Sequence, residues 1–118
     1  MEKRQKILIV DDEPTILETL ADVMEMKGYQ VVTAPNGEQG VIAAGKEKFR
    51  IILMDYKMPG MNGVETFTEI LKNDSGARVI FISGFYKDDC LNSLTRGVVG
   101  VCQKPLDIRK LLTMIEES

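Results

Sequence analysis

Three short apolar runs limit the folds open to this chain more than any other feature of the sequence. Ile7–Val10, Ile51–Met54 and Val79–Ile82 are continuous, with no alternation of apolar and polar side chains. Strands covered on both faces read in this way, and they are typical of parallel sheets packed between helices. Two weaker runs, Tyr29–Ala34 and Val98–Cys102, bring the expected number of strands to five.

Helical patterns lie between these runs. The clearest begins at Pro14, has apolar residues at helical spacing, and ends before Gly28, a residue common just past a helix end. Weaker patterns predict helices at Gly37–Lys46, Val64–Lys72, Lys87–Leu94 and Asp107–Glu117. The alternation predicts a doubly wound α/β fold, with a five-stranded parallel sheet and right-handed crossovers. It does not give the order of the strands in the sheet.

Length and charge exclude several classes of protein. The 118 residues fit a single domain, residues 1–118, because cores of roughly 100 to 150 residues are the commonest size. The net charge is −3 and the 15 basic residues are scattered, which argues against direct binding of nucleic acid. No apolar run approaches the roughly 18 residues of a membrane span, and MEKRQK lacks a signal segment. We therefore expect a cytoplasmic protein with no membrane partner.

The sequence lacks the histidine and cysteine residues needed for the commonest metal sites and nucleophiles. The chain contains no histidine, and Cys90 and Cys102 lack CxxC spacing. A zinc site and a Cys–His nucleophile are therefore excluded, and the cysteines are expected to be core thiols. Any chemistry must use carboxylates, hydroxyls and lysines.

Polar residues follow four of the five predicted strands. In chain order they are Asp11, Asp12 and Glu13, then Asp55, then Ser83 and Gly84, then Lys104 and Pro105. The carboxyl ends of parallel strands meet at one edge of the sheet, which is where open α/β folds bind ligands. One shared site explains this placement economically.

The acids in this set point to a divalent cation. Two carboxylates about 4 Å apart repel by roughly 4 kcal/mol at an effective dielectric constant of about 20, so converging acids destabilise the fold unless a cation lies among them. With oxygen ligands alone, a hard ion such as Mg²⁺ is preferred, and it also attracts phosphate.

Each polar residue also has a purely structural explanation. Asp12 could cap the first helix, and Glu13 could favour its dipole. Asp55 and the Pro-Gly and Asn-Gly pairs after it could form a turn, while Ser83 and Lys104 could be ordinary loop residues. These explanations are independent of one another, so all of them together are less economical than one site.

Four motifs resemble the receiver domain of two-component response regulators. They are ILIVDDEP at 7–14, IILMDYKMPGMNG at 51–63, VIFISG at 79–84 and QKP at 103–105, in the family's order and over nearly the whole chain. The resemblance implies a flavodoxin-like (βα)5 fold with strand order 2-1-3-4-5. It also implies a switch that takes a phosphoryl group from the phosphohistidine of a sensor histidine kinase. Phosphorylation then alters binding to an output domain or protein, homodimer formation included.

The resemblance assigns the acceptor and the metal ligands. Asp55 matches the aspartate that is phosphorylated. Asp11 and Asp12 match the acidic pair that binds Mg²⁺, and Asp55 and the main-chain carbonyl of Lys57 match the remaining protein ligands. Such a domain assists its own phosphorylation and dephosphorylation but is not otherwise an enzyme.

The resemblance also assigns the groups that contact the phosphoryl oxygens. Ser83 matches the hydroxyl that hydrogen-bonds them, and Lys104 matches the ammonium that pairs with them. Gly84 keeps side-chain bulk away from the acceptor. The peptide bond between Lys104 and Pro105 is expected to be cis, as is usual in the family.

The sequence departs from the family pattern in two respects. Val101 stands where many members have the Tyr or Phe whose inward movement accompanies phosphorylation. Lys57 and Phe85 stand where other members carry a group that orients water for attack on the acyl phosphate. Neither residue offers a carboxylate or amide, so a relatively long-lived phosphoryl group is expected.

Other functions are less consistent with the sequence. Val101 would suit a degenerate receiver that acts as a phosphorylation-independent interaction or dimerisation module, but all the matched site residues are present. Acids in the first loop would repel a flavin phosphate, and no GxxxxGK[ST] motif for nucleotide binding occurs. The chain is either a stand-alone regulator or a domain of a larger protein.

Overall fold

The computed structural model describes residues 5–84 and 96–118, which form five strands and four helices. The strands are β1 (Lys6–Val10), β2 (Gln30–Ala34), β3 (Ile51–Asp55), β4 (Val79–Ser83) and β5 (Val98–Gln103). The helices are α1 (Pro14–Met26), α2 (Gly37–Lys46), α3 (Gly63–Asn73) and α5 (Ile108–Glu117). All five predicted strands and four predicted helices are confirmed, with ends shifted by a residue or so. The predicted helix Lys87–Leu94 lies outside the described residues.

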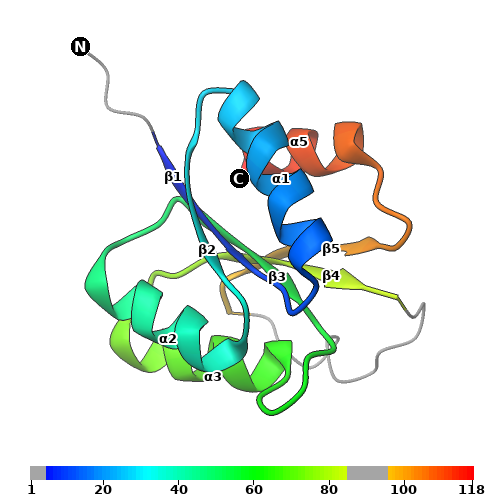
Figure 1. Ribbon diagram of the computed structural model, residues 1–118. Coiled ribbons are helices and arrows are strands. Elements are labelled where there is room, and N and C mark those ends of the chain that lie inside the picture. The colour runs from blue at the N-terminus through cyan, green and yellow to red at the C-terminus, as the bar shows by residue number, and fades with distance from the viewer. Residues whose placement is uncertain (1–4, 85–95) are drawn as a thin grey trace.

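The strands form one parallel sheet in the order β2-β1-β3-β4-β5. Helices α1 and α5 cover one face of the sheet, and α2 and α3 cover the other (Figure 1). The doubly wound fold is thus confirmed, as is the strand order that the resemblance implied. The chain moves from β1 outward to β2 and then returns to β3 on the other side of β1, so the switch point of the sheet lies between β1 and β3.

The sheet divides the hydrophobic core into two layers. Successive residues of a strand point to opposite faces, so Ile7 and Ile9 pack with residues of α1 and α5, whereas Leu8 and Val10 pack with residues of α3. All four side chains are buried. This is the physical reason that β1 reads as a continuous apolar run.

The end of α1 and the starts of α1 and α3 carry residues that are common at helix ends. Pro14 opens α1, and Gly28, with φ of +94°, lies just beyond its end. At the start of α3, the Glu65 N–H donates to Asn62 Oδ1 at 2.8 Å, and the Asn62 N–H donates to Glu65 Oε1 at 3.1 Å.

Among the described residues, no helix combines the length and the apolar character needed to cross a bilayer.

Strands β3 and β4 extend one residue further than the sequence predicted. Asp55 is paired with Ile82, and Ser83 is paired with Gln103, so these polar residues end their strands instead of following them. The adjoining helix α3 also approaches closely. A Cβ atom added to Gly63 would lie 2.6 Å from the main-chain oxygen of Asp55, which explains why glycine opens this helix.

Candidate functional site

Three carboxylates meet at the carboxyl edge of the sheet. Asp11 and Asp12 follow β1, and Asp55 ends the neighbouring strand β3. Oxygens from the three carboxylates lie within 4.8 Å of one another. Asp11 is 1% exposed and Asp55 3% exposed, whereas Asp12 is open to solvent. In the part of the chain that the structure describes, this is the one group of acidic or cysteine residues arranged to hold a metal ion.

Asp11 has one satisfied and one unsatisfied oxygen. Its Oδ1 accepts a hydrogen bond of 2.9 Å from the main-chain N–H of Glu13. Its Oδ2 is buried and has no hydrogen-bond partner among the described residues. A buried carboxylate oxygen that lacks a donor is costly, and a cation supplies the missing interaction. The donors therefore fit a hard divalent ion such as Mg²⁺.

The electrostatic environment of Asp55 also favours a cation. Burial, followed by the charge of Asp11, raises the pKa of Asp55 from 3.8 to about 7, while Lys104 acts in the opposite direction. Burial also raises the pKa of Asp11, against the lowering effect of its hydrogen bond from Glu13. Both carboxylates are thus disfavoured as anions in the metal-free protein, and a divalent ion among them reverses that effect.

Lys104 places its ammonium group beside the acids. Its Nζ lies 3.5 Å from Asp55 Oδ1 and 4.0 Å from Glu13 Oε1. The peptide bond between Lys104 and Pro105 is cis, as the resemblance implied. The contact with Glu13 was not predicted from the sequence, which assigned Glu13 only to the helix dipole. The third acid of the Asp-Asp-Glu run was the only signal for it.

Ser83 lies at the end of β4, next to the strand that carries Asp55. Its side chain is buried, with 1% exposure of the residue. The main-chain carbonyl of Ser83 accepts a hydrogen bond of 2.8 Å from the N–H of Lys104. Gly84 is exposed, and a Cβ atom added there would meet no described atom within 4 Å. The proposed role of Gly84, which is to keep side-chain bulk away from the acceptor, remains a prediction.

The remaining positions singled out in the sequence have different outcomes. Glu13, not Asp12, is the N-cap of α1, and it makes no side-chain capping bond, so the capping explanation for Asp12 was wrong. Lys57 is exposed two residues after Asp55, and Phe85 lies outside the described residues. Val101 is paired with Phe81 in the sheet and is 39% exposed. Lys57 as a metal ligand remains a prediction.

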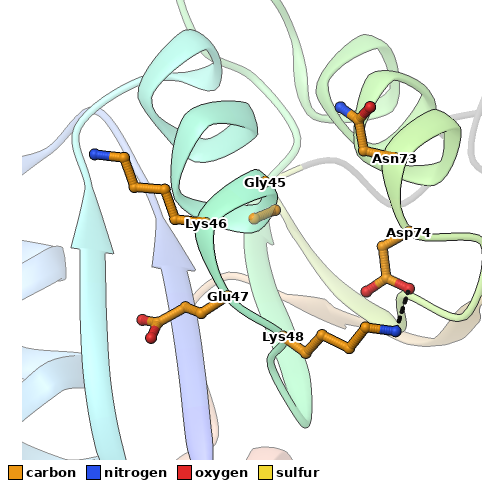
Figure 2. A pocket seen from close by; sticks show the side chains of 7 residues that line it. Gly45, Lys46, Glu47, Lys48, Asn73 and Asp74 are labelled. Atoms are coloured by element: carbon orange, nitrogen blue, oxygen red, sulfur yellow. Dashed lines mark ion pairs between the residues drawn. The ribbon is translucent and has the colours of Figure 1, made fainter.

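A polar groove lies at the other end of the strands, near their amino ends. It has a volume of about 620 Å³ and is lined by the C-terminal ends of α2 and α3 and the residues that follow them. Figure 2 shows that its charges are of both signs, with Lys48 Nζ 4.0 Å from Asp74 Oδ1. It brings together no cluster of acids like that around Asp55, so the carboxyl edge is the stronger candidate for chemistry.

A family model described as the response regulator receiver domain matches residues 7–116. The chain belongs to this family. Receiver domains accept a phosphoryl group from histidine kinases in two-component signalling, bind Mg²⁺ at an acidic pocket and act on output partners. The prediction drawn from the four sequence motifs is thereby confirmed.

Known receiver domains resemble this one along nearly its whole length. PilH of Pseudomonas aeruginosa is 36% identical over 113 residues, which are 93% of this chain and 93% of PilH. A CheY-like receiver structure from Methanospirillum hungatei has a TM-score of 0.90 and 32% identity, covering 98% of this chain and 93% of that one. CheY in a Borrelia burgdorferi complex with CheX, BeF3 and Mg²⁺ has a TM-score of 0.88 and 31% identity, with coverage of 96% and 87%.

Some relatives are considerably longer than this receiver domain. The chain spans 47% of one curated relative's length and 26% of another's. The similarity therefore establishes that this chain is a receiver domain, and it does not extend to the other parts of those longer proteins.

Proposed function

We propose that Asp55 is the phosphoryl acceptor of this receiver domain. We further propose that Asp11, Asp12, Asp55 and the main-chain carbonyl of Lys57 hold Mg²⁺. The observation that carries this proposal is the environment of Asp55. Asp55 is 3% exposed, and one of its carboxylate oxygens lies within 4.8 Å of an oxygen of Asp11 and an oxygen of Asp12. Lys104 Nζ lies 3.5 Å from Asp55 Oδ1.

The transfer step needs little covalent help from the protein. An oxygen of the Asp55 carboxylate forms a bond to phosphorus as the bond from phosphorus to the donor's imidazole nitrogen breaks. The imidazole keeps the electron pair and later takes a proton. When bound, Mg²⁺ neutralises negative charge on the phosphoryl oxygens. Asp55 must be ionised to attack, and Lys104 favours the ionised form.

Lys104 and Ser83 are assigned to the phosphoryl oxygens. Before transfer, the Lys104 ammonium faces the carboxylate of Asp55. Formation of the bond to phosphorus removes the negative charge of that carboxylate, and the phosphoryl group brings negative charge of its own into the site. The ammonium therefore pairs with a phosphoryl oxygen instead. The Ser83 hydroxyl lies on the adjoining strand and donates a hydrogen bond to the same group. Both residues then report the phosphorylated state to β4 and β5.

The wider assignment follows the family and the composition. Residues 1–118 form one receiver domain, either standing alone or within a larger protein. Its donor is a sensor histidine kinase in the cytoplasm, and its target is an output domain or protein, with a homodimer as one form of output. It contacts neither nucleic acid nor membrane directly, and it is a phosphoacceptor and not a turnover enzyme. The sequence contains every residue that the family pattern requires at the acceptor site, which argues against a phosphorylation-independent module.

Intact-mass measurement tests this proposal directly. The protein is incubated with Mg²⁺ and acetyl phosphate, and the wild type should gain the mass of one phosphoryl group. Asp55→Asn should gain none. Asp22→Asn changes an exposed acid on α1 in the same way and should behave as the wild type. Phosphorylation of Asp55→Asn at the wild-type level would contradict the assignment of the acceptor.

A further inference from the structure

Strand β2 has a free edge. It is the terminal strand of the sheet, and among the described residues only β1 pairs with it. Natural proteins usually protect such edges with charged side chains, an internal proline or a bulge. The five residues of β2, QVVTA, contain neither charge nor proline, and the register with β1 is regular throughout. The edge is therefore able to pair with another extended segment.

The hydrogen-bonding direction along β2 shows which groups are free. Gln30 donates its N–H toward the β1 side, to a carbonyl at 2.9 Å, and the Ala34 carbonyl accepts from that side at 3.2 Å. Main-chain groups of alternate residues in a strand point the same way. Val32 therefore faces β1 as well, whereas Val31 and Thr33 direct their N–H and C=O groups away from the sheet. These four groups are positioned to bond an added strand.

A groove lies on each side of the free edge. On the face covered by α1, a groove of about 400 Å³ is lined by the apolar groups of Leu17, Ala21 and Val31. On the face covered by α2, a smaller groove of about 210 Å³ is lined by Val32 and by Ile42, a residue that is 48% exposed. Side chains of an added strand alternate between the two faces. The two grooves are placed to receive them in turn.

The charge of the α1 groove indicates what kind of segment it accepts. Glu18 and Glu25 line it, Asp22 is exposed on the same helix, and none of the described residues that line it is basic. A second copy of the chain pairing through β2 in antiparallel fashion would bring α1 against α1, with acids facing acids. A partner segment with basic side chains would therefore have better electrostatic complementarity to this groove than a second copy of the chain.

The spacing of the two glutamates sets the length of the segment. Glu18 and Glu25 are seven residues apart on α1, which places them about 10 Å apart along the helix. The first and fifth residues of an extended segment are about 13 Å apart and point to the same face. Five residues, basic at both ends and apolar between, therefore match the groove.

We propose that the free edge of β2 is a docking site for an extended segment of a partner protein, added as a sixth strand, with basic side chains placed against Glu18 and Glu25. The site is separate from Asp55 and does not depend on its phosphorylation. The partner contributes main-chain hydrogen bonds to Val31 and Thr33 and apolar side chains to both grooves. This mode of recognition derives affinity from the backbone and specificity from alternate side chains.

Titration of the isotope-labelled protein with the capped peptide Lys-Val-Val-Val-Lys tests the proposal by NMR. The largest shifts should appear at the amides of Val31 and Thr33 and in the two grooves. The peptide Glu-Val-Val-Val-Glu should bind more weakly. The double variant Glu18→Lys and Glu25→Lys should lose about fivefold in affinity for the lysine peptide, as expected for two exposed ion pairs, and should gain affinity for the glutamate peptide.

Two further measurements separate strand addition from nonspecific attraction. The peptide is N-methylated either at its second and fourth residues or at its first, third and fifth. Only one set of N–H groups can face β2, so one version should fail to bind and the other should bind. Thr33→Pro, which removes an outward N–H and no bond to β1, should also abolish binding while the circular dichroism spectrum is retained.

Several results would overturn the proposal. Equal binding of both N-methylated peptides would show attraction without strand pairing. Shifts centred away from β2, or no shifts with any peptide, would exclude the edge as the docking site. Concentration-dependent dimerisation that Thr33→Pro abolishes would identify a second copy as the occupant instead.

Discussion

Replacing Asp55 with asparagine should stabilise the metal-free protein at neutral and alkaline pH. Burial raises the pKa of Asp55 from 3.8 to about 7. At about 1.4 kcal/mol per pKa unit, this difference corresponds to about 4 kcal/mol by which folding disfavours the ionised carboxylate. Asparagine has nearly the same shape and no charge. The gain in the free energy of unfolding should therefore approach about 4 kcal/mol above pH 7.

The direction of the pH dependence follows from proton binding. Between pH 4 and about 7 the folded protein keeps the proton on Asp55, while the unfolded chain has released it. Stability therefore falls as the pH rises through this range, and it levels off above pH 7. Below pH 4 both states are protonated and Asp55 makes no difference through this effect. Asp55→Asn should remove the fall contributed by this residue.

Urea unfolding in the presence of EDTA measures the effect. Curves for the wild type and Asp55→Asn at pH 5 to 8 should diverge as the pH increases. Asp22→Asn, an exposed acid on α1, should follow the wild type. If the difference in the free energy of unfolding between the wild type and Asp55→Asn stayed constant across this range, the folded state would not disfavour the ionised form of Asp55.

Three other changes probe the same region. Asp11→Asn should remove the rise in melting temperature that Mg²⁺ gives the wild type, because it alters the buried oxygen that has no partner among the described residues; an undiminished rise would exclude Asp11 as a ligand. Gly63→Ala should cost about 1–3 kcal/mol in urea unfolding, since its Cβ would press on the main chain of Asp55, and wild-type stability would mean that α3 shifts freely. The phosphoryl group should persist on the purified protein, because the side chains of Lys57 and Phe85 contain neither a carboxylate nor an amide to orient water; complete loss within seconds would contradict this.

Much of the fold was readable because burial on both faces leaves a direct trace in the sequence. A strand such as Ile7–Val10 has no polar face, and that absence identifies a central parallel strand. The strand order came only from the family resemblance, since no local pattern records which strands are neighbours. The strand ends were misplaced by one residue because Asp55 and Ser83 are polar but still belong to the hydrogen-bonded ladder.

The candidate site was predictable to the extent that it lies at strand ends. Asp11, Asp12 and Asp55 could be grouped because the carboxyl ends of parallel strands share one edge. The approach of Lys104 to Glu13 could not, since it depends on how two loops fold toward each other. The acidic groove beside β2 was also invisible, because it combines residues of a helix and a strand that have no periodic relation.

The hydrogen bond from the Lys104 N–H to the Ser83 carbonyl involves main-chain atoms alone. It connects the ends of β4 and β5 through atoms that every amino acid except proline provides at the donor position. Substitution at Val101 leaves this connection intact, whatever side chain is placed there. The main-chain connection between residues 83 and 104 therefore does not depend on which side chain occupies position 101.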